Sequence, residues 1–244
     1  DINPAITAST GIAATHIGGM TIHSWSGIGI RTKLNKYDLD KIASSEYIVK
    51  RVNRTKVLII DEISMLSTNM LDMVDMVCRE IKQSSEPFGG IQIVLVGDFF
   101  QLPPITKREG EVKQSTLMGN TKNSGIFAYD AGAWERSRLV VCYLSEQHRQ
   151  DDKLFLDILS ALRKNEILES HREALQKRFE KPPAFSRRTL TKLFSHNEDV
   201  DKLNNAELER LYGQAENFCM VSSGKESLIM QLKKGCLSPE NLTL

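Results

Sequence analysis

Two short apolar runs, each followed at once by acidic residues, constrain the fold of this chain more than any other feature. Residues 57–60 read Val-Leu-Ile-Ile and precede Asp61-Glu62, and residues 91–96 read Ile-Gln-Ile-Val-Leu-Val and precede Gly97-Asp98. Runs of this length, rich in Val and Ile, are typical of strands in a parallel sheet that is covered on both faces. Segments of helical period alternate with them, which predicts an α/β fold built on a parallel sheet.

The remaining elements follow the same alternation. Two further strands are expected at residues 5–8 and 139–143. A helix is expected to begin near Ser67 or Thr68, with its core face formed by Met70, Leu71, Val74, Val77 and Ile81. Other helices are expected at residues 39–52, 152–164, 172–179 and 199–212, and a polar loop at 107–124. Lys181-Pro182-Pro183 interrupts the pattern, which predicts a main domain over residues 1–180 and an incomplete continuation over 181–244.

Charge and cysteine content exclude several classes of protein. The 244 residues carry 32 Lys and Arg against 31 Asp and Glu, which argues against a basic tail or a disordered chain. No run of about 18 apolar residues is present, so no membrane span is expected. The four cysteines are far apart, so neither a zinc site nor a disulfide framework is predicted.

The near-zero net charge hides a partition along the chain. Residues 31–56 carry eight basic and three acidic side chains, residues 57–104 carry two and seven, and residues 163–192 carry nine and four. Each basic stretch alone fits a solvated surface helix. Two of them around an acidic centre also fit a protein that holds a polyanion at its rim and a metal cation in its middle.

The acidic strand ends are candidates for phosphoryl-transfer chemistry, because open α/β sheets bind ligands at the carboxyl edge. Asp61 can hold Mg²⁺ there, and Glu62 can orient or deprotonate a water molecule. Gln101, stiffened by the following prolines, can hydrogen-bond a γ-phosphate, and Arg149 can neutralise transition-state charge. The alternative for Asp61 and Glu62 is that they are ordinary acidic surface residues. The alternative for Gln101 is a place on a polar loop, and for Arg149 a surface salt bridge.

Two segments rich in hydroxyl side chains are candidates for binding phosphate groups. Residues 7–14 predict a strand, a tight turn and a helix start with free backbone N–H groups, and residues 21–29 add a second such turn. His23 fits a structural histidine better than a catalytic one. Trp25 fits either a platform for base stacking or a core residue.

These segments together resemble a known family. In their sequences and in their order, six segments closely resemble those of the PIF-type (petite integration frequency) DNA helicases of superfamily 1. They are residues 7–14, Gly18-Gly19-Met20-Thr21-Ile22-His23-Ser24, Asp61-Glu62-Ile63-Ser64-Met65, residues 87–92, residues 97–104 and His148-Arg149-Gln150. The resemblance covers residues 3–165, and a weaker likeness continues through residues 193–204.

The resemblance implies a RecA-like P-loop NTPase fold and a motor that couples ATP hydrolysis to five-prime-to-three-prime movement on single-stranded DNA. It implies that Asp61 holds Mg²⁺ through water, Glu62 activates the hydrolytic water, Gln101 senses the γ-phosphate and Arg149 contacts it. The family's DNA-contacting segments correspond here to Thr7, Ser9, Thr10, Gly11, His23 and Ser24.

The resemblance also sets expectations about biology. It implies a monomer that acts on single-stranded, forked or G-rich DNA in repair, recombination and telomere maintenance, without a membrane partner. The expected location is the nucleus or mitochondrion of a eukaryote, or the cytoplasm of a bacterium.

One departure from the family concerns the phosphate-binding loop. No GxxxxGK[ST] sequence is present, and Ser223-Gly224-Lys225-Glu226 lacks both the earlier Gly and the following hydroxyl residue. Because the family carries this loop upstream of the position of Thr7, we expect a fragment that lacks the loop and the second motor domain, with negligible ATPase activity of its own. Two other functions stay open: a non-enzymatic module that binds single-stranded DNA, and a metal-dependent nuclease or phosphatase using Asp61, Glu62 and Asp98.

Overall fold

The structure is a computed structural model that forms two compact units, Asp1–Ser145 and Glu146–Leu244. It describes residues 3–104, 126–179, 192–194, 197–213, 216–224, 226, 229–230 and 240–243. The domain boundary predicted near Lys181 and the loop predicted at 107–124 both lie outside the described residues. The first compact unit ends at Ser145.

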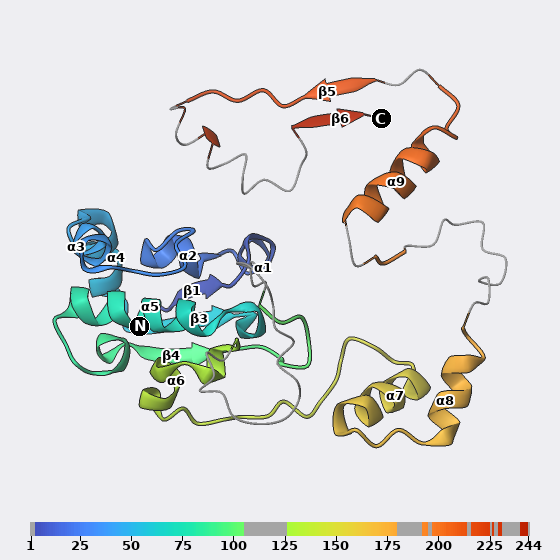
Figure 1. Cartoon of the computed structure of the whole chain (residues 1–244), viewed down its shortest axis with the longest axis horizontal. Helices are drawn as coiled ribbons and strands as arrows, with labels where there is room; N and C mark the ends of the chain where they lie inside the picture. Colours follow the sequence, from blue (N-terminus) through green and yellow to red (C-terminus); the bar gives the residue numbers. More distant parts are fainter. Residues whose placement is uncertain are drawn as a thin grey trace. The chain divides into compact units, whose positions relative to one another are not determined.

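A four-stranded parallel sheet lies at the centre of the first unit (Figure 1). The strands are arranged in the order β2 (Met20–Thr21), β1 (Ala5–Ala8), β3 (Val57–Asp61) and β4 (Gln92–Leu95). The register pairs Ala8 with Asp61 and Ile60 with Leu95. All four strands therefore end at one edge, and the predicted α/β fold with a parallel sheet is confirmed.

The two faces of this sheet differ in burial, which corrects the prediction that both are covered. Leu58 and Ile60 are fully buried on one face, whereas Ile6, Ile59 and Val94 lie side by side in register on the other. Ile6 is 40% exposed and Val94 36%. A continuous apolar run therefore did not mean two equally buried faces here, because among the described residues the helical core packs against the face of Leu58 and Ile60.

Helix α5 (Thr68–Lys82) supplies most of that core. Its N-cap is Ser67, whose hydroxyl accepts a hydrogen bond from the Met70 amide, as the sequence predicts. Apolar residues recur at helical spacing, and Met70, Leu71, Val74 and Val77 are buried while Ile81 is partly buried. The helix contacts α3 (Lys36–Ala43), α4 (Glu46–Arg54) and α6 (Gly132–Ser137), so it joins the first unit together.

The single helix predicted at residues 39–52 is two helices, α3 and α4. The break falls at Ser44 and Ser45, where Ser45 adopts an extended conformation before α4 begins. Serine favours helix ends because its hydroxyl competes for backbone groups, and the Ser44 hydroxyl donates to the Lys41 carbonyl. The short elements of this unit are α1 (Gly11–His16), α2 (Ile22–Ser26), η1 (Ile63–Met65), η2 (Pro87–Gly90) and η3 (Ala128–Asp130).

The strand predicted at residues 139–143 is wrong. These residues belong to no strand, and Val140 and Tyr143 are each 89% exposed. A strand is stable only when its backbone groups pair with a neighbour. Within the part of the chain that the structure describes, β4 pairs with β3 alone, and residues 139–143 form no ladder with its outer edge.

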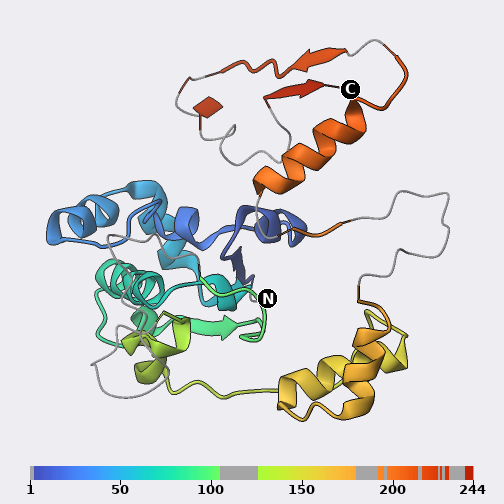
Figure 2. The ribbon, with the colours of Figure 1, turned by 45° about the vertical axis from the view of Figure 1, so that its right-hand side comes forward.

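The second unit is built from α7 (Lys153–Lys164), α8 (Glu169–Gln176), α9 (Asn197–Leu208) and an antiparallel pair of strands, β5 (Asn217–Cys219) and β6 (Asn241–Thr243). Helices α7 and α8 lie side by side in both ribbon views (Figure 1 and Figure 2). The α7 prediction is confirmed with Asp152 as N-cap, whereas α8 and α9 begin two or three residues earlier than predicted.

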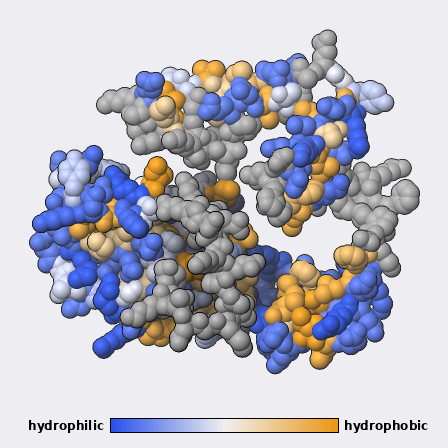
Figure 3. Space-filling view, in the orientation of Figure 1, coloured by the Kyte–Doolittle hydropathy of each residue, from blue (hydrophilic) through white to orange (hydrophobic). Residues whose placement is uncertain are grey.

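Packing is sparse among the described residues of this unit. Apolar side chains gather on the visible face of α7 and α8 (Figure 3). On α7, Leu154 is 50% exposed and Leu162 48%. The buried His171 ring is held in place, since its Nε2 lies 2.9 Å from an Asp157 oxygen and its Nδ1 accepts from the Leu168 amide. None of the described helices is long and apolar enough to cross a membrane.

Candidate functional site

The first part of the site is the turn after β3, which presents two adjacent carboxylates. Asp61 ends the strand, and its Oδ1 accepts a hydrogen bond of 2.9 Å from the Glu62 amide. Glu62 has a left-handed backbone, with φ 54° and ψ 46°. This conformation costs a residue with a side chain about 1–2 kcal/mol, and such outliers cluster at functional sites. The sequence predicts the acids here but not the strained backbone.

The turn after β4 packs directly against the turn after β3. The Ile63 amide donates to the Val96 carbonyl at 3.0 Å. A β-carbon built on Gly97 would lie 2.9 Å from both the backbone nitrogen and Cγ2 of Ile63. The prediction that Gly97 permits close backbone approach is therefore confirmed.

Asp98 organises the residues that follow Gly97. Its side chain accepts hydrogen bonds from the Phe100 amide at 3.1 Å and from Gln101 Nε2 at 3.3 Å, and its carbonyl accepts from the Gln101 amide. Gln101 is exposed but tethered, with its side-chain amide turned toward Asp98. The structure thus brings Asp98 and Gln101 together on one loop.

An aromatic cluster that the sequence analysis missed holds the same loop. The Phe99 ring meets the rings of Phe127, Tyr129 and Trp134 edge-on, with centroid distances of 6.1, 4.9 and 6.0 Å. Edge-to-face contacts of this kind stabilise aromatic pairs beyond simple burial. No sequence pattern pointed to the cluster, because residue 99 and its partners are about 30 positions apart.

The turn after β1 is the neighbour of the acidic turn and has hydroxyl side chains in place of acids. The Ser9 amide donates to the Asp61 carbonyl at 3.1 Å, and Thr10 caps α1 by accepting from the Ala13 amide. Gly11 is exposed. Thr7 is fully buried, and its hydroxyl donates to the Ile59 carbonyl at 2.7 Å, so its side chain supports the turn from inside the sheet.

The second hydroxyl-rich segment lies at β2 and α2. The Thr21 hydroxyl contacts the Ser24 hydroxyl at 3.0 Å and accepts from the Ser24 amide at 3.2 Å. His23 is partly buried, and this burial lowers the pKa of its imidazole below the ordinary value. Trp25 is 2% exposed and is a core residue, which excludes it as a stacking platform in this conformation.

The residues around Asp61 fit the expected Mg²⁺. The buried hydroxyl groups of Ser9 and Ser64, on the turns that flank Asp61, have no hydrogen-bond partner. Mg²⁺ usually takes one or two carboxylates and keeps several waters, which such hydroxyls can bind. A cluster of three or more His, Cys, Asp or Glu residues is absent among the residues that the structure describes.

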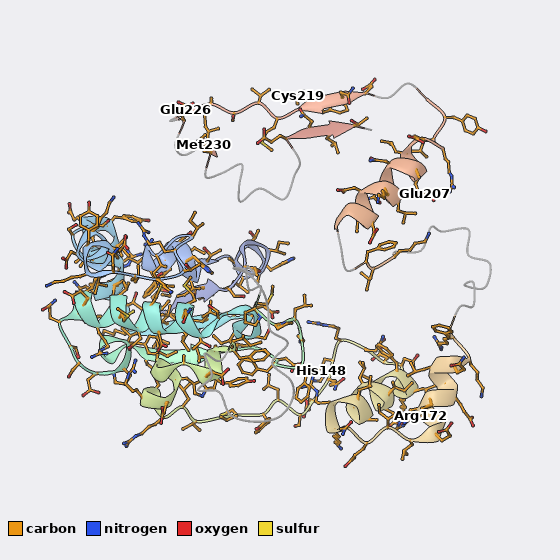
Figure 4. All side chains as sticks on the ribbon, viewed as in Figure 1. His148, Arg172, Glu207, Cys219, Glu226 and Met230 are labelled. Carbon is orange, nitrogen blue, oxygen red and sulfur yellow. The ribbon has the colours of Figure 1, made fainter. Side chains whose placement is uncertain are left out.

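Arg149 belongs to the second unit and is exposed. Its neighbour His148 lies 3.2 Å from a Glu146 oxygen through Nε2, just before α7 (Figure 4). The contact of Arg149 with a γ-phosphate stays a prediction.

Comparison with known proteins supports one family. The model of the PIF1-like helicase family matches residues 2–173. The ATP-dependent DNA helicase Pif1 of Psychrobacter sp. is 42% identical over 248 aligned residues, which cover 98% of this chain and 36% of the relative. The chain therefore spans little more than a third of that relative's length.

Solved structures agree with this assignment. The Pif1 helicase from Candida albicans matches with a TM-score of 0.78 and 31% identity, covering 99% of this chain and 52% of that one. A Pif1 helicase from Bacteroides in complex with ADP-AlF3 and ssDNA matches with a TM-score of 0.71 and 29% identity, covering 99% and 54%. The α/β fold of the first unit is thus the fold of a helicase motor domain.

Proposed function

Because this chain belongs to the PIF1-like helicase family, we propose that the full-length protein is an ATP-dependent DNA helicase moving five-prime-to-three-prime on single-stranded DNA. The observation that carries the proposal is the pairing of two chemically opposite turns at one sheet edge. A turn with hydroxyl and backbone N–H groups, suited to phosphate, is hydrogen-bonded through Ser9 to the carbonyl of Asp61, whose carboxylate suits a metal.

We assign the hydrolytic roles to the acidic turn and the loop beside it. Asp61 would hold Mg²⁺ through water, and the metal would neutralise charge on the nucleotide phosphates. Glu62 would orient and deprotonate the attacking water. Gln101, tethered to Asp98, would hydrogen-bond the γ-phosphate without adding charge, and Arg149 would contact the same phosphate.

The strand-binding roles fall to the hydroxyl-rich turns. Thr10 and Gly11 after β1, and His23 and Ser24 in α2, offer hydroxyl, imidazole and backbone N–H groups to a DNA backbone. Ser9, whose hydroxyl is buried and whose amide donates to the Asp61 carbonyl, would hold the turn in place. Contacts of this kind position a strand without reading its bases. We therefore propose weak sequence preference and strong salt dependence. Thr7 would act by holding the turn.

The biological setting that we propose follows from the family. Forked and G-rich DNA would be substrates, and repair, recombination and telomere maintenance the processes served. The protein would act as a monomer in a nucleus, a mitochondrion or a bacterial cytoplasm.

The test is the substitution Glu62→Gln. It is made in the full-length protein, because residues 1–244 contain no GxxxxGK[ST] loop and are not expected to hydrolyse ATP alone. Loss of a general base typically costs 10²- to 10⁴-fold, so DNA-stimulated ATP hydrolysis should fall by about 100-fold or more. Affinity for single-stranded DNA should change by less than about 3-fold, since this acid lies outside the strand-binding turns. Fluorescence anisotropy with an oligothymidylate gives the affinity.

Glu46→Gln is the matched control, since it removes the same charge from an exposed position on α4. It should leave ATP hydrolysis unchanged. Normal ATP hydrolysis by Glu62→Gln would contradict the role of Glu62. DNA binding without any nucleotide turnover in the wild-type protein would favour the non-enzymatic module, and DNA cleavage with Mg²⁺ alone would favour the nuclease.

A further inference from the structure

Arg51 is a basic side chain that the fold buries almost completely. It lies on α4 and is 8% exposed. Its Nη2 donates to the Ser24 carbonyl at 3.0 Å, and its Nη1 lies 3.6 Å from the Met20 sulfur. The Tyr47 ring covers the guanidinium, with its centroid 4.9 Å from Cζ, and the buried Nε has no partner.

This burial is unusual because no carboxylate compensates the charge. Arg136 pairs with Asp75 at 2.8 Å and Arg31 with Asp38 at 3.2 Å, whereas no ion pair involves Arg51 in the described part of the chain. Burial without an anion lowers the pKa of the guanidinium, but Arg remains protonated at neutral pH. A buried cation normally pairs or binds a ligand, so this one points to an anion from outside the chain.

The surroundings of Arg51 indicate where that anion would lie. The guanidinium touches the backbone of Ser24, whose hydroxyl is exposed and bonded to that of Thr21. The atoms covering it belong to Met20 and Tyr47, which are 37% and 72% exposed. Helices α2 and α4 are in contact, and the Arg51 charge lies against the backbone carbonyl of Ser24 in the second hydroxyl-rich segment.

We propose that Arg51 is a positioning residue that holds Ser24 and supplies the fixed positive charge beneath one backbone phosphate of a bound single strand, at the Thr21 and Ser24 hydroxyls. This inference rests on the proposed DNA-binding function and extends it to a residue outside the hydroxyl-rich segments. A charge held in a low-dielectric site attracts an anion more strongly than the same charge in water.

The experiment compares Arg51→Met with Arg54→Met in the full-length protein. Both variants lose one positive charge from α4, but Arg54 is exposed. Affinity for an oligothymidylate is measured by anisotropy over a series of salt concentrations. Arg51→Met should weaken binding by about 10-fold and lower the salt slope by about one, as expected for one lost phosphate contact. Arg54→Met should weaken binding less than about 3-fold.

A second measurement separates this role from a purely structural one. Oligonucleotides carrying a single uncharged methylphosphonate linkage at successive positions remove one phosphate charge at a time. The wild-type protein should lose affinity at one linkage in the bound register, and Arg51→Met should be insensitive at that linkage. Such coupling between one phosphate and one side chain would not arise from general loosening of α2.

The outcomes are distinct. Equal losses in Arg51→Met and Arg54→Met, or equal sensitivity of wild type and Arg51→Met at every linkage, would overturn the proposal. If thermal unfolding shows that Arg51→Met does not fold, Arg51→Lys replaces it in the test. This variant keeps the charge and should keep the sensitive linkage. Loss of that sensitivity would overturn the proposal. Failure of the wild-type protein to bind single-stranded DNA at low salt would instead contradict the proposed function.

Discussion

The turn after β1 and the turn after β3 are next to each other, since Ala8 pairs with Asp61, yet they differ in almost every physical respect. The turn after β1 carries hydroxyl groups and a relaxed, extended Thr10 that caps α1. The turn after β3 carries two acids, and Glu62 has a left-handed backbone. One sheet edge therefore presents a hydroxyl-rich turn and an acidic turn side by side, and we propose that they bind an anion and a cation. The predictions below ask how far one turn can be changed without the other.

The largest effect is expected from Gly97→Ala. The new methyl group would lie 2.9 Å from the Ile63 nitrogen, so the turns after β3 and β4 must move apart. A displacement of about 1 Å can cost about 100-fold in rate, and we expect that loss in DNA-stimulated ATP hydrolysis. DNA affinity should stay within about 3-fold, because the atoms that the new methyl group would meet belong to Ile63 and Ser64 on the turn after β3. Gly11→Ala, where a β-carbon meets no atom within 4 Å, is the control for added volume in the hydrolysis assay at saturating DNA alone, because Gly11 belongs to the proposed strand-binding turn.

Phe99→Ala is expected to have an intermediate effect. It removes the ring that the other three aromatic residues contact, and we expect a loss of about 2 kcal/mol in the free energy of unfolding, less than for a fully buried Phe. Phe100→Ala removes the same number of atoms from a side chain that is 71% exposed and should cost less than about 0.5 kcal/mol. Urea unfolding measures both values, and equal costs would contradict an anchoring role of Phe99.

The smallest effect is expected from Glu62→Gly. Glycine adopts the left-handed conformation without the cost that a β-carbon brings, but it also loses more entropy on folding, which leaves a net gain of at most about 1 kcal/mol. Glu62→Gln, with its β-carbon retained, controls for the lost charge. Thermal unfolding should therefore rank Gly above Gln at this position. The reverse order would show that the backbone of Glu62 is not strained.

Much of the fold could be predicted from the sequence, because its strongest elements depend on local patterns. The runs before Asp61 and Gly97 form strands, and α5 begins after Ser67 as its capping residue predicts. The prediction of a strand at residues 139–143 was wrong, because strand formation requires a neighbouring strand, which an apolar run does not reveal. The break between α3 and α4 at Ser44 was not predicted, because two serines within a helical pattern are compatible with one helix or with two.

The candidate site was predictable where chemistry coincides with a strand end, and not where it depends on tertiary packing. Asp61, Glu62 and Gln101 follow strands and lie at the expected edge. Ser9 and Thr10 lie at the end of β1, but the burial of Thr7 in the sheet appears only in three dimensions. Arg51 and Phe99 escaped sequence analysis, because their partners come from other elements. The Tyr47 and Arg51 spacing of four residues on α4 was the one available local signal.

The hydrogen bond from the Ser9 amide to the Asp61 carbonyl has a thermodynamic consequence. Under the proposed function, a bound strand that displaced the turn after β1 would change the position of Asp61, so the affinities for the strand and for the metal-nucleotide would be linked. Linkage is reciprocal: if a strand tightens nucleotide binding by some factor, the nucleotide must tighten strand binding by the same factor. The single hydrogen bond between the turn after β1 and the end of β3 would thus couple the binding of the two proposed ligands.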